Sequence, residues 1–198
     1  RQRKIRYDRR DHILYSKTIS ETMPDYFRLT SKTLCNQATY VKDQETIVDA
    51  KKLAEVTAKA LSIDPSTIHV EALDQANIND AIELFSAVLE KRYKEHSKDW
   101  TQERRDFAEK TVCLDCIDRR WTKHIDSMSK LRDAIWLRSY AQTDPLQAYT
   151  NEGFARFDDR NSNIANDVVR TILHVRFRKN PEVQQNLAKA PINQTIPA

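Results

Sequence analysis

The apolar positions follow a helical period along most of the chain. Between Met23 and Ala38 they recur at spacings of three and four residues, which predicts an amphipathic helix with a proline in its first turn. Two further helices are predicted at 47–61, which is rich in Ala, Lys and Glu, and at 78–93. These elements indicate a module of shorter helices in the middle of the chain.

Local signals mark some of the boundaries of these elements. Asn77 is a suitable N-cap for the helix at 78–93, and the spacing of Asp99 and Gln102 is that of a capping box for the next helix. Ile68 and Val70 are consistent with a short extended piece between two helices.

The most regular pattern in the chain follows, from about residue 101 to 140. One apolar series recurs every seven positions and a second series falls between its members: Phe107, Leu114, Trp121, Met128 and Ile135, with Ile117, His124 and Leu131 between them. Such a stripe needs a partner helix to cover it. The segment from Pro145 to about Arg178 supplies one, because Asp144-Pro145 marks a helix start and an apolar face follows. The sequence therefore predicts an all-α fold in which long antiparallel helices carry a smaller helical module.

Composition excludes several classes of function. The 198 residues include one glycine, Gly153, so neither a phosphate-binding loop nor a dinucleotide fingerprint can be written into the chain. We therefore expect no nucleotide cofactor here, and the chain begins within a basic helical pattern, which suggests a piece of a longer protein. The net charge of +4 permits an anionic lipid partner, but the basic start lacks interleaved aromatic residues, so we expect no nucleic acid.

The cysteine and histidine residues do not form the pattern of a metal or catalytic site. Cys113-x-x-Cys116 has no second ligand pair to complete a zinc site, and it lies inside a helical stripe, where we expect a packing role. With Cys35 the total is three, which fits a reducing compartment rather than a disulfide framework. His124 lies on the apolar stripe itself. We expect neither a metal site nor a catalytic residue in this chain.

A longer motif runs from Asp118 to Pro145. It reads D-x-x-W-x-x-H-I from Asp118, then L-R at Leu131, then L-R-x-Y-A-Q-x-D-P from Leu137, while the start of the chain reads Q-R-K-x-x-Y-x-x-R-D-x-I-L from Gln2. These residues closely resemble the C-terminal helical region of SecA, the motor ATPase that drives preproteins through the bacterial Sec channel.

The resemblance implies a division of the chain into parts. Residues 1–17 would end a long scaffold helix, 18–91 would form the helical wing, 92–179 would continue the scaffold with a two-helix finger, and 180–198 would be a flexible tail. The finger would rise along 101–127 and return along 131–140. Its tip would contact the translocating polypeptide through Ser127, Met128, Ser129 and Lys130. The periodicity alone instead predicts one helix as far as Tyr140.

The resemblance assigns the remaining motif residues to the finger core and its motif. These are Asp118, Trp121, His124, Leu131, Arg132, Leu137, Arg138, Tyr140 and Gln142. Lys130 stands where many family members have an aromatic residue, and Ala134 and Ser139 stand where glycines are usual, which suggests an accessory type of SecA.

The resemblance also implies a function. The parent protein would be an ATP-hydrolysing preprotein translocase with ATP and Mg as cofactors, located in the bacterial cytoplasm and peripherally on the plasma membrane. This fragment would hydrolyse nothing itself; its partners would be the SecYEG channel, unfolded preprotein and the motor domains of the same chain. The alternative is a stand-alone helical module that binds a protein or a nucleic acid.

Overall fold

The computed structural model describes residues 10–42, 44–138 and 145–177. Its helices are α2 (Met23–Gln37), α3 (Ala50–Leu61), α4 (Ile78–His96), α5 (Gln102–Arg138) and α6 (Pro145–Ile172), preceded by a helical segment at 10–15. Two antiparallel strands, β1 (Thr39–Lys42) and β2 (Glu45–Val48), form a hairpin, and 3-10 turns occupy Pro65–Thr67 and Glu71–Leu73. The prediction of an all-α fold is confirmed, with this one small hairpin as the exception.

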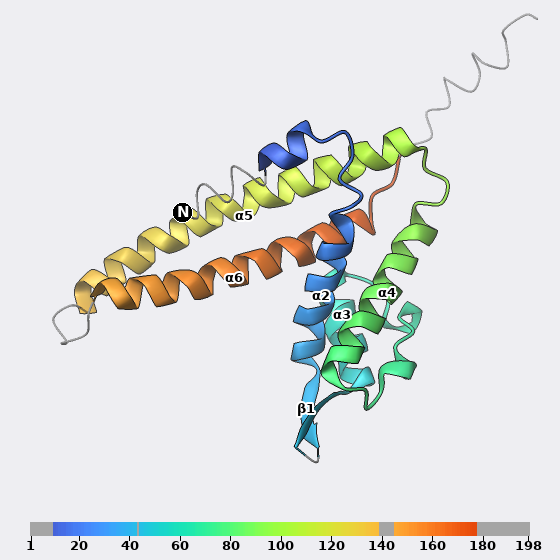
Figure 1. Ribbon diagram of the computed structural model, residues 1–198, viewed down its shortest axis with the longest axis horizontal. Coiled ribbons are helices and arrows are strands. Elements are labelled where there is room, and N and C mark those ends of the chain that lie inside the picture. The colour runs from blue at the N-terminus through green and yellow to red at the C-terminus, as the bar shows by residue number, and fades with distance from the viewer. Residues whose placement is uncertain (1–9, 43, 139–144, 178–198) are drawn as a thin grey trace, which may run out of the picture.

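Two long antiparallel helices dominate the arrangement. α5 and α6 lie side by side, and the module of α2, α3 and α4 projects from one end of the pair (Figure 1). The segment at 10–15 lies against α5, where Ile13 is buried and Arg10 pairs with Asp118 at 3.3 Å. No helix in the described ranges is both long and apolar enough to cross a bilayer.

The module forms largely as the pattern predicts. The face of α2 that carries Met23, Phe27 and Leu34 is buried, and the Asn77 side chain accepts a hydrogen bond from the Asn79 amide at the start of α4. The helix predicted from residue 47 instead begins at Ala50, because Asp49 caps it and the preceding residues pair as β2.

The extended piece expected at Ile68 and Val70 does not form a strand. Both side chains are buried, but they lie between the two 3-10 turns. The capping box expected at Asp99 is also wrong. The cap lies two residues further along the chain, where the Thr101 hydroxyl accepts a hydrogen bond from the Arg104 amide at 3.3 Å.

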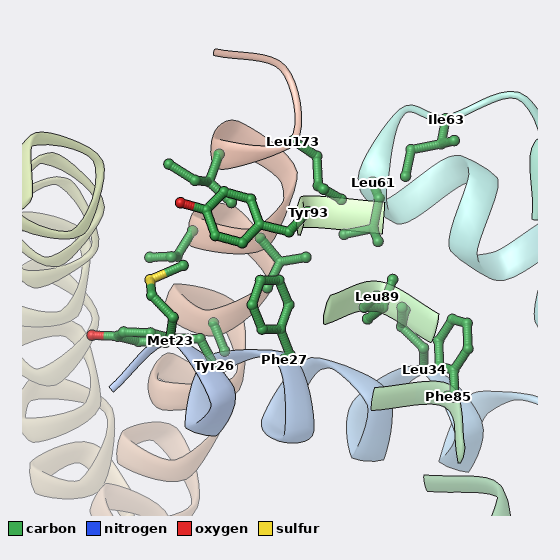
Figure 2. Packing of buried hydrophobic residues seen from close by; sticks show 14 of the residues in the cluster. Met23, Tyr26, Phe27, Leu34, Leu61, Ile63, Phe85, Leu89, Tyr93 and Leu173 are labelled. Atoms are coloured by element: carbon green, nitrogen blue, oxygen red, sulfur yellow. The ribbon is translucent and has the colours of Figure 1, made fainter. Parts of the chain in front are cut away.

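The core is continuous from the module into the base of the long hairpin. Figure 2 shows side chains of α2 and α4 meeting Leu61 and Leu173, which close the cluster from α3 and from the end of α6. Fully burying a large apolar side chain contributes about 1.5–3 kcal/mol, so this shared core fixes the module on the hairpin.

The left-handed backbone positions are occupied without glycine. Ser62, which follows the last residue of α3, has φ 55°, and Gln44 and Gln75 have φ 67° and 59°. This conformation costs about 1–2 kcal/mol for a residue with a Cβ, so each position retains strain that a glycine would relieve.

The fingertip predicted at 127–130 is wrong. α5 runs through these residues as one helix of 37 residues, about 55 Å at 1.5 Å per residue. No glycine or proline interrupts it, and two serines lower helix propensity only slightly. The chain reverses instead between the end of α5 at Arg138 and the start of α6 at Pro145, so the returning arm is α6 rather than 131–140.

Candidate functional site

The candidate site is the long hairpin of α5 and α6. Contacts pair early residues of one arm with late residues of the other: Arg120 with Asp167, Ser127 with Arg156, and Met128 with Gly153. This order shows that the arms are antiparallel.

The buried seam of α5 is displaced from the heptad expected from the sequence. Ile117, His124, Leu131 and Ile135 are buried as expected, but Phe107 is 66% exposed. Leu114, Trp121 and Met128 are half-buried. Near the base, where α5 also contacts the segment before α2 and α4, the buried positions are instead Ala108, Val112, Cys113 and Cys116.

A buried carboxylate ties the arms together in the base half of the hairpin. Asp167 on α6 is 4% exposed and accepts hydrogen bonds from Arg120 Nε at 2.5 Å and from Arg170 at 3.0 Å. Burial by itself raises the pKa of Asp167, but the Arg120 hydrogen bond and the charges of Arg120, Arg170 and Arg119 outweigh it, so the pKa lies below its ordinary value. The carboxylate is therefore ionised and acts as a cross-link between α5 and α6.

Further along, an aromatic cluster surrounds one arginine. The His124 ring lies 5.6 Å from Trp121 and 6.2 Å from Phe157, and the Arg160 guanidinium lies over both Phe157 (4.3 Å) and Trp121 (5.2 Å). Burial lowers the pKa of His124, and the charges of Arg160 and Arg156 lower it further. His124 is thus a neutral packing residue in the seam, where its ring and Arg160 join the two arms.

A second buried carboxylate joins the module to the base of the hairpin. Glu109 on α5 is 1% exposed and accepts from the Tyr93 hydroxyl of α4 at 2.7 Å and from the Ser20 hydroxyl at 2.8 Å. Burial, followed by the Glu109 hydrogen bond, raises the pKa of Tyr93, which remains a donor. Lys110 donates to the Ser16 carbonyl beside it. Thus α4, the segment before α2 and α5 itself meet at Glu109.

The structure separates the four residues predicted for the tip. Ser127 accepts from Arg156 at 2.7 Å and Met128 touches Gly153, so both belong to the seam, while Ser129 and Lys130 are exposed along the shaft. Each lies two to three turns before the end of α5.

The other motif residues have varied positions. Leu131 is buried, Arg132 is exposed beside Asp133, and Asp118 pairs with Arg10. Leu137 and Arg138 are the last residues of α5. Tyr140 and Gln142 lie outside the described residues, as does the tail at 180–198.

The described ranges contain no group of three His, Cys, Asp or Glu side chains that could bind a metal ion together. Cys113 and Cys116 are fully buried thiols, and burial raises the pKa of Cys116, which disfavours a reactive thiolate.

Sequence reasoning missed Glu109, Arg160 and Asp167. In the sequence these three residues look like the charged residues of any solvent-exposed helix face. Only their position on the buried side of each helix distinguishes them. Asp167 offers the clearest signal, because it directly precedes the apolar pair Val168-Val169 and lies one turn after Ile164.

Comparison with known proteins identifies the family of this hairpin and its module. The family model described as "SecA Wing and Scaffold domain" matches residues 1–176. The protein translocase subunit SecA of Clostridium novyi is 28% identical over 181 residues, covering 91% of this chain and 22% of the relative. The subunits of Clostridium beijerinckii and Clostridium kluyveri are each 29% identical, covering 91% and 98% of this chain, but 21% and 23% of their own length. The chain therefore spans about a fifth of these relatives, and it belongs to the SecA wing and scaffold domain family.

Proposed function

We propose that this chain is the wing and scaffold part of a SecA-type translocase, and that its α5–α6 hairpin is the finger that contacts the translocating polypeptide. The observation that supports this most is the shape of the hairpin in a chain of this family. Its base shares a core with α2–α4, and its far end, where α5 ends and α6 begins, lies away from that module (Figure 1).

The physical argument is that such a hairpin transmits displacement. Sliding α5 along α6 would break the hydrogen bond from Arg120 to Asp167 and expose the buried seam. A push at the Glu109 junction would therefore move the far end as well. The base would act as the input of a lever, and this is how the fragment would couple to a motor or regulate it.

The partners and the energy source are part of this proposal. The motor domains, with ATP and Mg, would lie in parts of the parent protein outside this chain, and the fragment alone would not hydrolyse ATP. Unfolded preprotein and the SecYEG channel would meet the far end of the hairpin, at the cytoplasmic face of the bacterial plasma membrane.

An exposed apolar residue close to the reversal offers a suitable contact. Leu146, in the first turn of α6, is 72% exposed, and Phe154 two turns later is 54% exposed. Exposed apolar side chains can hold an unfolded segment without sequence preference, because the attraction depends on buried area rather than on fixed geometry.

Site-specific crosslinking tests the proposal. A photo-crosslinking amino acid at Leu146 of the full-length protein should form an adduct with a polypeptide stalled in the channel, in the presence of ATP. The matched control is Phe107, also apolar and exposed, which lies 31 residues before the end of α5, about 46 Å along the helix. Absence of an adduct at Leu146, or equal adducts at both positions, would contradict the assignment of the far end as the contact.

A further inference from the structure

The two arms of the hairpin enclose a groove on the side where the aromatic cluster lies. It has a volume of about 290 Å³ and takes lining residues from both helices. Arg120 and Lys123 come from α5, and Arg156 and Arg160 come from α6. We call this feature the basic groove.

The lining of the basic groove is rich in hydrogen-bond donors. Beside the four cationic side chains, the Ser127 hydroxyl and the Asn163 amide also reach it, while Asp159 is the one carboxylate in the lining. Two more carboxylates approach from outside, Asp167 at Arg120 and Glu152 at Arg156. The cations outnumber the carboxylates even when all three are counted.

The arrangement of the arginines adds to the positive potential. Arg156 and Arg160 are four residues apart on α6, so they occupy the same face, where like charges destabilise a helix. Arg156 is oriented by its 2.7 Å hydrogen bond to Ser127, and Arg160 is fixed over Phe157 and Trp121. His124 also lines the groove, and its pKa is lowered by burial and then by the charges of Arg160 and Arg156.

We propose that the basic groove binds a phosphate group that bridges α5 and α6, with Arg120 and Lys123 on one side and Arg156 and Arg160 on the other. This inference does not rest on the proposed function, because it depends only on residues of the hairpin. A bound phosphate would relieve the repulsion between Arg156 and Arg160 and add a second ionic cross-link beside Asp167.

The chemistry favours a phosphomonoester over a carboxylate. A phosphomonoester carries a charge of about −1.5 to −2 near neutral pH and has three strong acceptor oxygens that point in different directions. Donors from two helices can then bind one ligand together, and each guanidinium has five N–H groups, so Arg120 and Arg156 keep donors beyond their existing partners. A flat carboxylate with one charge suits a single arginine better.

Titration of the 198-residue chain with sodium phosphate, followed by amide NMR shifts, tests the proposal against sodium chloride at equal ionic strength. We expect saturable shifts centred on Ser127 and Asn163. Arg156→Gln and Lys123→Gln should each weaken binding by about tenfold or more, as expected for loss of one charge-assisted hydrogen bond. Circular dichroism confirms that each variant folds.

Arg132→Gln is the matched control. It removes the same charge from α5, but Arg132 has a side chain 72% exposed and lies outside the basic groove. An equal loss in Arg132→Gln would show a general charge effect and overturn the proposal. Acetate that binds as tightly as phosphate would overturn the phosphate class.

Vesicles distinguish the source of the phosphate. Binding to phosphatidic acid vesicles that Arg156→Gln weakens and Arg132→Gln does not would identify a lipid headgroup. Binding of inorganic phosphate without such vesicle binding would identify a soluble phosphate. If neither probe binds in a way that depends on Arg156 and Lys123, the groove has no phosphate site.

Discussion

Asp167→Asn is the sharpest test of how the hairpin is held together. Asn preserves the volume of the side chain but removes the charge that Arg120 and Arg170 share. Because Asp167 is 4% exposed, water cannot replace the lost interactions at the carboxylate.

The magnitude follows from the two hydrogen bonds and their exposure. A hydrogen bond to a charged group contributes about 1.5–3 kcal/mol net. The side chains of Arg120 and Arg170 are 27% and 41% exposed, so solvent recovers part of the loss on their side. We therefore expect Asp167→Asn to lower the free energy of unfolding by about 2–3 kcal/mol, below the full cost of breaking a wholly buried pair.

The assay is urea unfolding of wild type and variant at a series of pH values. The pKa of Asp167 is lowered in the folded chain, so the unfolded state takes up a proton first as the pH falls through the ordinary value of 3.8. The stability that Asp167 supplies is present above that pH and is lost as the pH falls through the lower, folded pKa. The difference between wild type and Asp167→Asn should shrink over the same range.

Asp115→Asn is the control, because Asp115 pairs with Arg119 at 2.6 Å but on the surface, with side chains 66% and 44% exposed. We expect it to cost less than about 0.5 kcal/mol. If the two variants cost the same, burial does not set the strength of these pairs and the reasoning fails.

Three further predictions concern single positions. Ser62→Gly should raise the free energy of unfolding by about 0.5–1 kcal/mol in urea melts, because Ser62 has φ 55°, and a loss of stability would contradict the strain. Gly153→Ala should be neutral or stabilise the chain by up to about 1 kcal/mol, because the added Cβ would meet only the flexible Met128 Cε at 3.2 Å. Gly153→Leu should destabilise it by about 1–3 kcal/mol through overpacking, and thermal melts that rank the two variants in reverse would refute the close approach of the helices. The pKa of His124 is lowered in the folded chain, so the unfolded state gains a proton first as the pH falls below about 6.5, and the free energy of unfolding drops. His124→Gln should flatten this part of the pH profile of unfolding, and an unchanged profile would show that His124 does not titrate there.

The helices and most of their boundaries could be predicted because their signals are local. The buried face of α2, the Asn77 cap and the start of α6 at Pro145 all follow from spacing or from a single side chain. The β1–β2 hairpin could not be predicted, because its turn contains no glycine and Tyr40 and Val41 are exposed rather than alternating with buried residues.

The candidate site shows the limit of both pattern and resemblance. Periodicity alone placed one helix through 127–130, and that is what the structure has, whereas motif alignment put the reversal too early. The basic groove could not be anticipated, because it depends on which turn of α6 faces Arg120 and Lys123, and the register between two helices is set by packing along their whole length. The spacing of Arg156 and Arg160 is the one local hint.

The continuous core has a consequence for how order is distributed along the hairpin. The main cluster takes in α5 only as far as Ile117 and α6 only from Ile164 onward, while Leu131 and Ile135 are buried outside it. The base should therefore unfold together with α2–α4 as one cooperative unit, and the distal half should open at much lower free energy. Amide hydrogen exchange would accelerate stepwise along α5 beyond Ile117, so the part that extends farthest can loosen and re-form while its anchorage stays intact.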